Sequence, residues 1–377
     1  MKKVGMIIIL ILGIIVFANL QQEEKTKGIY ISYIEISNHL KDKEELESKQ
    51  EINQMIHNVK EMGLNTIILQ VRPSMDAIYL SDVFPTSKYI KEEGNMSYDV
   101  LSYFISKSHK EKIKVIAWIN PYRILTQGTR EDIPLNSLVY EKRYTDLVVE
   151  VNGVFLNPAK EESTRIILEG IDELLMYSID GILMDDYFYP GENVDEEDYK
   201  EYQINHPNST IQEFHIQIIN DMIRKVHSRC KQKKVPFGVS PEGNIENNYM
   251  TNAADVKRWL KEDGYIDFIM PQLYYGFENE TKPFINTFKE WQELNKRKIP
   301  LIPALALYKV GTVDTYARSG QNEWLENDNI IQKEIIHLKN QKDYQGFVIY
   351  RYDNIWEEDY FTKTSKKEID NMKKVIK

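Results

Sequence analysis

The chain has 377 residues and a formal net charge of −10, a length that suits a single α/β barrel. No run of Lys or Arg is long enough to form a basic surface, which argues against nucleic acid as a partner. The only cysteine, Cys230, excludes a disulfide framework, so the fold must rely on its hydrophobic core. The 24 tyrosines suit sugar binding, because each offers a flat apolar face and a hydroxyl group.

The first residues have the pattern of an export signal. Two lysines precede an apolar run from Val4 to Ala18, and a charged stretch follows. Val16 and Ala18 suit cleavage before Asn19, while an uncleaved membrane anchor is the alternative. We therefore expect a signal peptide or anchor over 1–20, a linker over 21–27 and one domain over 28–377. The domain is expected outside the cytoplasm, either secreted or anchored to the outer face of the cytoplasmic membrane. Contact with the membrane is expected only through an uncleaved N-terminal segment.

Eight apolar segments rich in Ile, Val, Tyr and Phe predict strands at 28–35, 65–73, 114–123, 181–188, 235–243, 265–275, 300–309 and 346–353. Apolar residues at helical spacing lie between most of them, at 52–62, 161–178, 209–229, 253–263, 283–296 and 328–341. Ser209 or Thr210 is a suitable N-cap for the third of these helices. Strands that alternate with helices in this way predict a single (β/α)8 TIM barrel.

The region between the third and fourth strands is extended. About 30 residues, 124–153, precede the next helical pattern. A connection of that length is uncommon unless it has a function. We therefore expect it to form part of the wall of a cleft at the C-terminal ends of the strands, where TIM barrels place their chemistry.

Polar and aromatic residues gather at the predicted strand ends. They are Glu35, Arg72, Asp76, Trp118, Asn120, Tyr122, Arg123, Asp185, Asp186, Tyr187, Tyr189, Glu242, Asn244, Gln272, Tyr274, Tyr275, Tyr308, Lys309, Arg351, Tyr352 and Asp353. None of the seven histidines ends a strand, which makes a metal-dependent hydrolase the less favoured alternative. No glycine-rich phosphate loop and no nucleophile elbow is present, and no cofactor is expected.

Carboxylates with aromatic rings suit cleavage of a glycosidic bond, which needs one protonated and one ionised carboxyl group. We predict Asp185 or Asp186 as nucleophile or base and Glu242 as proton donor. Side chains alternate along a strand, so only one of the two aspartates is expected to point inward, and Asp185 is favoured as the reacting group. The substrate-binding residues are predicted to be Glu35, Arg72, Asp76, Trp118, Asn120, Tyr122, Arg123, Tyr187, Tyr189, Asn244, Gln272, Tyr274, Tyr275, Tyr308 and Arg351.

Several of these residues also have structural alternatives. Arg72 and Arg351 are equally suited to pair with the acids, and Trp118 to pack in the core. Glu242 is as well suited to a loop as to proton donation. Tyr187 and Tyr189 follow the strand end, so we expect both rings to be exposed as sugar platforms.

Six sequence blocks resemble the glycosyl hydrolase-like family 10: QVRPSMDAIYLSDVFPTSKYI (70–90), AWINPYR (117–123), FLNPA (155–159), DGILMDDYFYP (180–190), FGVSPEGN (237–244) and YIDFIMPQLYYGF (265–277). The resemblance spans about residues 27–355. It implies an exported TIM barrel distantly related to the α-amylase type of glycoside hydrolase, with peptidoglycan glycan strands as substrate of some members. It also implies that Asp185 occupies the position of the amylase nucleophile, although Leu183 replaces the polar residue usually found two positions before it.

These observations predict an exported glycoside hydrolase that acts on a polysaccharide, with peptidoglycan glycan strands as the expected substrate. A non-catalytic glycan-binding barrel at the cell surface is the alternative from another class, because Leu183 and Glu242 depart from the expected pattern. A metal-dependent deacetylase or amidase is a third possibility, and it requires two or three histidines within coordination reach.

Overall fold

A computed structural model describes residues 24–191 and 193–377, so the predicted signal or anchor over 1–20 lies outside the described residues. Within this part of the chain, no helix combines the length and apolarity needed to cross a bilayer. Eight parallel strands form the main sheet in the order β10-β11-β1-β2-β3-β7-β8-β9. They are β1 (Thr26–Ile31), β2 (Thr66–Arg72), β3 (Lys114–Ile119), β7 (Gly181–Met184), β8 (Phe237–Val239), β9 (Phe268–Ile269), β10 (Ala304–Ala306) and β11 (Gly346–Tyr350).

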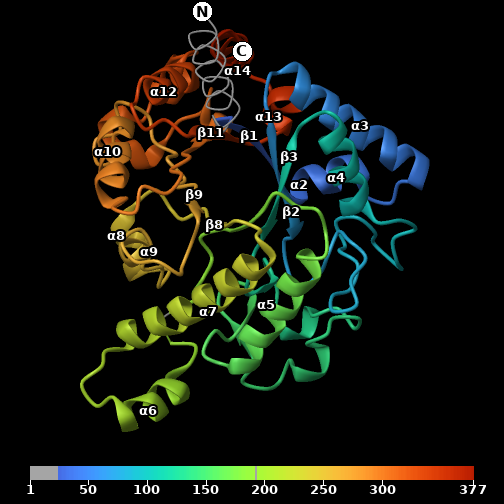
Figure 1. Cartoon of the computed structure of the whole chain (residues 1–377), viewed down its shortest axis with the longest axis vertical. Helices are drawn as coiled ribbons and strands as arrows, with labels where there is room; N and C mark the ends of the chain where they lie inside the picture. Colours follow the sequence, from blue (N-terminus) through green and yellow to red (C-terminus); the bar gives the residue numbers. More distant parts are fainter. Residues whose placement is uncertain (1–23, 192) are drawn as a thin grey trace, which may run out of the picture.

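The two ends of this sheet meet, so that the strands curl into a ring surrounded by helices (Figure 1). The backbone N–H of Ile302 donates to the Ile269 carbonyl, and that of Ala304 donates to the Pro271 carbonyl, both at 2.9 Å. These bonds join β9 to the segment that leads into β10. The architecture is that of a TIM barrel. All eight strands predicted from the sequence are confirmed.

The helices are α2 (Tyr33–Leu40), α3 (Glu45–Glu61), α4 (Val100–Lys110), α5 (Glu161–Leu174), α6 (Glu196–Asn205), α7 (Ile211–Lys233), α8 (Ile245–Met250), α9 (Val256–Trp259), α10 (Phe284–Leu294), α11 (Glu323–Glu326), α12 (Ile330–Lys339), α13 (Asp353–Trp356) and α14 (Lys363–Ile376). The sequence predicted α3, α5, α7, α9, α10 and α12, whereas the other helices were not predicted. Short 3-10 turns are η1 (Arg130–Asp132), η2 (Tyr140–Lys142), η3 (Leu307–Lys309), η4 (Thr315–Gly320) and η5 (Glu358–Tyr360). Thr210, one of the two predicted caps, begins α7 through a capping box with Glu213.

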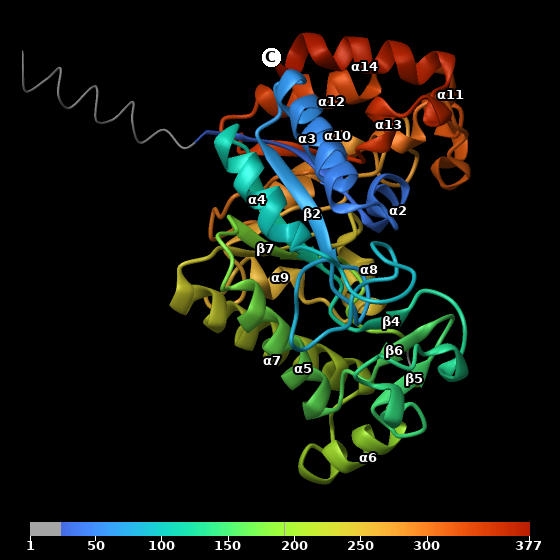
Figure 2. The ribbon, with the colours of Figure 1, turned by 90° about the vertical axis from the view of Figure 1, so that its right-hand side faces the viewer.

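The extended region after β3 folds into a small antiparallel sheet of order β4-β6-β5, formed by β4 (Arg123–Leu125), β5 (Val148–Glu150) and β6 (Val154–Leu156). Figure 2 shows this sheet beside the barrel and close to α6. Because β4 begins four residues after β3 ends, the small sheet lies at the C-terminal ends of the barrel strands. The predicted long connection therefore has strands of its own.

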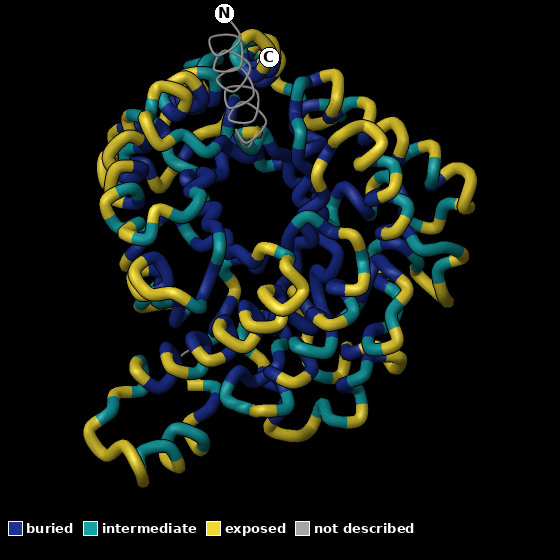
Figure 3. Tube along the Cα trace, in the orientation of Figure 1, coloured by how far each residue is buried: buried dark blue, intermediate teal, exposed yellow. Residues whose placement is uncertain are grey.

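Two layers of apolar side chains hold the barrel together, and its strands are largely buried (Figure 3). The larger layer lies between the strands and the helices. The smaller fills the inside of the ring with Tyr30, Ile68, Ile116, Trp118, Leu183, Phe268, Met270, Ile302, Ala304 and Val348. Leu183 therefore points inward from β7, whereas Met184 belongs to the outer layer. This alternation sets the direction of Asp185, which follows directly.

Candidate active site

Asp185 continues the inward-facing side of β7 and is only 4% exposed. The Trp118 indole donates a hydrogen bond to Oδ2 at 3.1 Å. The Asn120 amide donates to Oδ1 at 3.1 Å and to Oδ2 at 3.2 Å. Both partners come from β3 or the residues just after it, the neighbouring strand of the sheet. Because an indole N–H and an amide NH2 are donors only, they bind the ionised form of the carboxyl group.

Asp186 lies beside it and has fewer hydrogen-bond donors. Gln272, which follows β9, donates to Asp186 Oδ1 at 3.0 Å. Burial, together with the negative charge of Asp185, raises the pKa of Asp186 to about 7. Burial also raises the pKa of Asp185, but Arg123 and the donated bonds of Trp118 and Asn120 oppose that rise. The donors around Asp185 therefore favour its ionised form, whereas the surroundings of Asp186 favour a protonated carboxyl group.

The expectation that only one aspartate faces inward is corrected by these contacts. Strand pairing of β7 ends at Met184, so strict alternation no longer governs Asp186. Both carboxylates raise the pKa of the Tyr30 hydroxyl, which burial raises first. Tyr30 belongs to the inner layer of the barrel. The two acids therefore lie on the same side of β7, toward the barrel axis.

Glu242 joins this group from the end of β8. Its backbone pairs with that of Gln272, and its side chain accepts a hydrogen bond from Asn247 at 2.8 Å. Its charge is among the influences that raise the pKa of Asp186. Gln272 also donates to the Ser240 carbonyl at 2.9 Å, which fixes its amide between the ends of β7 and β8. Three acids from two neighbouring strands therefore meet at one end of the barrel.

Aromatic residues border the acids. Arg123 lies over the Tyr187 ring at 4.5 Å, and Tyr187 is 53% exposed, as expected for a platform. Tyr274, Tyr308 and Tyr350 pack against one another with ring centroids 5.8 Å apart. Tyr308 is exposed, whereas Tyr274, like its neighbour Tyr275, is partly buried. The tyrosines thus provide apolar faces next to the carboxylates, the combination that sugar binding uses.

Three predicted substrate-binding residues are buried at the strand ends, and their predicted roles are corrected. Arg72 is fully buried, with its guanidinium 4.2 Å from the centre of the Phe84 ring. Tyr122 is also fully buried, and its hydroxyl has no hydrogen-bond partner among the described residues. Tyr189 is 7% exposed rather than open to solvent. Its hydroxyl bonds Asp195 and its ring stacks on His215, so it anchors the segment after β7 instead of forming a platform.

Glu35 and Arg351 form an ion pair of their own at 2.5 Å. Glu35 is fully buried on the first turn of α2, where it forms a capping box with Ser32. The predicted first strand therefore ends at Ile31, because Ser32 begins a helix. Of the two functions considered for Arg351, pairing with an acid is the one observed, and the acid is Glu35 rather than an active-site aspartate. Neither residue is free to bind a sugar.

The remaining predicted residues lie at the edge of the site. Asn244 caps α8 by accepting the Glu246 backbone N–H at 3.1 Å. Asp76 lies in a separate cavity of about 560 Å³ between the segments after β2 and β3, together with Lys88 and Leu125. Burial raises the pKa of Asp76 to about 6. The main group around Asp185 therefore does not include these two residues.

Sequence reasoning missed Tyr30, Ser240 and Tyr350. The Tyr30 hydroxyl lies 2.9 Å from Ser240 Oγ, which donates to the Met270 carbonyl at 2.8 Å. Tyr30 and Tyr350 lie inside predicted strands, where a tyrosine looks like an ordinary core residue. Their inward parity was the one indication available, since Tyr30 shares its direction with Gly28, two residues earlier on β1, which faces Ile68 and Val348 of the inner layer.

The comparisons with known proteins agree with this geometry. The model of the family Glycosyl hydrolase-like 10 matches residues 25–324. Glycosyl hydrolase YngK of Bacillus subtilis is 29% identical over 327 residues, which cover 78% of this chain and 62% of YngK. Glycosyl hydrolase DigH of Escherichia coli K12 is 28% identical over 344 residues, which cover 82% of this chain and 75% of DigH. The chain thus spans less than two thirds of YngK.

Solved structures share the fold at low sequence identity. The glycoside hydrolase domain of PgaB (BpsB) from Bordetella bronchiseptica superimposes with a TM-score of 0.62 at 12% identity, covering 93% of this chain and 99% of that domain. α-Amylases are also among the solved structures with this fold. The resemblance noted from the six sequence blocks is confirmed.

Proposed function

The chain belongs to the glycosyl hydrolase-like 10 family, and we propose that it hydrolyses glycosidic bonds in a polysaccharide, with peptidoglycan glycan strands as substrate. The observation that carries the proposal is the pair formed by Asp185, which is buried, and Asp186, which is partly buried beside it. One carboxylate is held by two donor side chains, and the other is desolvated beside it, with its pKa raised to about 7. A glycoside hydrolase needs one ionised and one protonated carboxyl group near neutral pH.

In this proposal Asp186 is the proton donor to the leaving oxygen. This assignment differs from the sequence-based prediction, which gave that role to Glu242. Asp185 supplies the negative charge that stabilises the positive charge developing at the anomeric carbon, and it keeps Asp186 protonated. Glu242 adds to the same effect from β8. The exposed tyrosines, Tyr187 and Tyr308, would hold sugar rings.

The sign of the pH dependence follows from the donor. Asp186 works only while protonated, so activity is expected to fall as the pH rises above about 7. Glu242→Gln removes one negative charge near Asp186 and therefore lowers its pKa. The basic limb of the pH–rate profile is expected to move to lower pH in that variant.

The peptidoglycan substrate is supported by the predicted export and by the family resemblance. It is tested by digesting glycan strands with and without stem peptides, alongside α- and β-glucans. The expected result is the release of reducing ends from the peptidoglycan glycan strands and not from the α- or β-glucans. Cleavage of a glucan instead would replace the substrate while leaving the two carboxylates in place. Binding of the strands with no turnover by any preparation would favour the glycan-binding barrel.

The roles of the acids are separated by the leaving group. Asp185→Asn, Asp186→Asn and Glu242→Gln are compared on a natural oligosaccharide and on its dinitrophenyl glycoside, whose leaving group departs without a proton. Asp186→Asn is expected to lose activity on the natural bond by about 10²-fold or more and to regain most of it on the activated one. Asp185→Asn is expected to stay impaired on both.

Glu246 is an exposed acid on α8, and Glu246→Gln serves as the control. This variant is expected to have the same activity as the unmodified chain on both substrates. If the dinitrophenyl substrate restores Glu242→Gln and leaves Asp186→Asn inactive, the proton donor is Glu242 and our assignment fails. If all three variants keep full activity, the site itself is wrong.

A further inference from the structure

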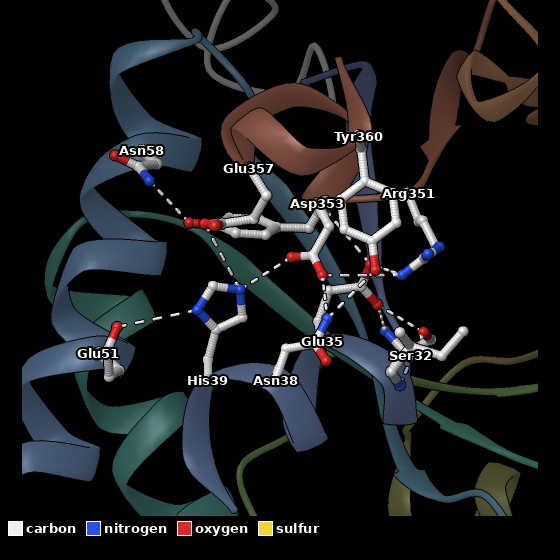
Figure 4. A network of polar contacts seen from close by, with 12 residues as sticks. Ser32, Glu35, Asn38, His39, Glu51, Asn58, Arg351, Asp353, Glu357 and Tyr360 are labelled. Carbon is white, nitrogen blue, oxygen red and sulfur yellow. Dashed lines mark hydrogen bonds and ion pairs between the residues drawn. The ribbon is translucent and has the colours of Figure 1, made fainter.

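A second group of acids surrounds His39 on the far side of the Glu35–Arg351 ion pair. We call it the His39 cluster, and it consists of His39 on α2, Glu51 on α3, and Asp353 and Glu357 in the segment after β11. Figure 4 shows these side chains turned toward the imidazole. His39 Nε2 lies 2.9 Å from Asp353 Oδ1 and 3.7 Å from Glu357 Oε1. The proposed glycosidic chemistry uses none of these residues.

Three of these side chains have the spacing of metal ligands. His39, Asp353 and Glu357 each offer one ligand atom, and these atoms all lie within 4.8 Å of one another. They come from two segments that are far apart in sequence but close at the junction of β1 and β11. An imidazole nitrogen with two carboxylate oxygens is a donor set that suits a transition metal such as zinc.

The groups behind these ligands fit the same function. Asp353 is fully buried, and its other oxygen, Oδ2, accepts a hydrogen bond from Asn38 at 2.8 Å. The other imidazole nitrogen, His39 Nδ1, faces Glu51 Oε2 at 3.9 Å. Metal-binding histidines commonly present their second nitrogen to a carboxylate, and ligating carboxylates are themselves hydrogen-bonded. Asn38 thus orients Asp353 from behind, and Glu51 places a carboxylate on the far side of the imidazole.

The charges around the cluster favour a divalent cation over a single proton. Arg351 is 2.5 Å from Glu35, and Lys43 is 2.6 Å from Glu51, so both cations already have partners. Among the described residues, the group that can supply positive charge to both Asp353 and Glu357 is the imidazole of His39, and Arg351 approaches Asp353 at a longer distance of 3.9 Å. A protonated imidazole supplies one positive charge against these two carboxylates, whereas a divalent ion supplies two.

We propose that the His39 cluster binds one zinc ion through His39 Nε2, Asp353 Oδ1 and Glu357 Oε1. Water completes the coordination, because Glu357 is partly exposed and leaves the ion accessible from solvent. The ion ties α2, which follows the first barrel strand, to the segment that follows the last one. It therefore stabilises the pairing of the first and last strands of the barrel, β1 and β11, and takes no part in bond cleavage.

The test is isothermal titration of the full chain with zinc chloride after treatment with EDTA and dialysis. The chain carries no polyhistidine tag, because such a tag binds zinc itself. The expected result is one saturable zinc site per chain and a rise in melting temperature on zinc addition. Magnesium, which prefers oxygen ligands, is expected to give neither effect at equal concentration.

Two variants with matched controls locate the site. His39→Gln and Glu357→Gln are each expected to weaken zinc binding at least about tenfold. His109→Gln is the control for the first, since His109 also faces a carboxylate at 2.9 Å but has no third ligand beside it among the described residues. Glu358→Gln, one residue further along the chain, is the control for the second. Both controls are expected to bind zinc as the unmodified chain does.

Glu357 is partly exposed, so Glu357→Gln keeps the fold even where His39→Gln does not, and circular dichroism verifies this. The proposal is overturned if the unmodified chain shows no saturable zinc site. It is also overturned if Glu357→Gln binds zinc as tightly as Glu358→Gln. Because the readouts are binding and thermal stability, neither result depends on whether the chain hydrolyses a glycan.

Discussion

Glu334 on α12 is a buried acid, and replacing it gives the sharpest prediction about stability. Its side chain is fully buried, and neither carboxylate oxygen has a hydrogen-bond partner in the part of the chain that the structure describes. Burial, followed by the nearby charges of Glu368 and Glu323, raises the pKa of Glu334 well above its ordinary value, while Lys309 opposes the rise. The folded chain therefore keeps Glu334 protonated at pH values where an exposed glutamate is ionised.

The magnitude follows from proton linkage. Because the folded-state pKa is raised, the contribution of Glu334 to stability is fully present below about pH 4.5 and is lost as the pH rises toward the folded-state value. While the folded chain holds one more proton than the unfolded chain, the free energy of unfolding falls by about 1.4 kcal/mol per pH unit. The loss accumulates over the pH range between about 4.5, the ordinary value, and the raised pKa of the folded chain. Glu368, whose pKa is raised to about 7 by burial, acts in the same direction.

Glu334→Met removes the titrating group while keeping an unbranched side chain that favours helix. At pH 7 we expect the variant to be more stable than the unmodified chain by about 1–3 kcal/mol, and the gain to increase with pH. Urea denaturation at pH 5, 6 and 7 measures it, with the exposed Glu326→Gln as control. A variant that is less stable at pH 7, or a gain that does not change with pH, would refute the reasoning.

Three further predictions concern the site and its support. Trp118→Phe removes one hydrogen-bond donor from Asp185, and such a bond to a charged group is worth about 1.5–3 kcal/mol. The pKa of Asp185 should therefore increase, and the acidic limb of the pH–rate profile should move to higher pH by roughly one unit or more. A lower kcat with no movement of this limb would contradict the prediction. Gly170→Ala would place Cβ 1.9 Å from a guanidinium nitrogen of Arg72. Urea denaturation is expected to show that the free energy of unfolding falls by about 1–3 kcal/mol. An unchanged free energy of unfolding would mean that the helix shifts to make room, and would contradict the prediction. Tyr187→Ala should raise KM about tenfold at nearly constant kcat, because a ring stacked on a sugar contributes about 1–2 kcal/mol to binding. A fall in kcat with an unchanged KM would contradict a function of Tyr187 in substrate binding.

The eight strands could be predicted because parallel strands are covered on both faces, which leaves continuous apolar runs in the sequence. The helix α6 was not predicted, since none of its residues is buried and it carries no apolar stripe. The first strand was predicted to end at residue 35, four residues beyond its end at Ile31. Apolar residues continue past Ile31, but the capping box of Ser32 and Glu35 starts a helix there.

Within the site, the sequence could indicate which strand ends carry acids but not how each side chain is satisfied. The inward direction of Asp185 follows from strand alternation, and the structure places it with the inward-facing Leu183. Tyr189 was predicted to be exposed, yet its polar hydroxyl is satisfied inside the protein by Asp195, while the ring stacks on His215 on α7. No local pattern reports a partner that folding brings from a distant helix.

The number of hydrogen-bond donors that face each acid distinguishes Glu35 and Asp185 from Asp186, the proposed proton donor. Glu35 accepts bonds from Ser32 and from the guanidinium of Arg351, so its oxygens are occupied by a structural ion pair. Asp185 is bound by two donor side chains, which favour its ionised form. Asp186 receives a side-chain hydrogen bond only from Gln272 within the described residues, although it lies beside another buried charge. A carboxyl group in that position holds a proton near neutral pH and keeps an oxygen free for the substrate, which is the combination that a general acid requires.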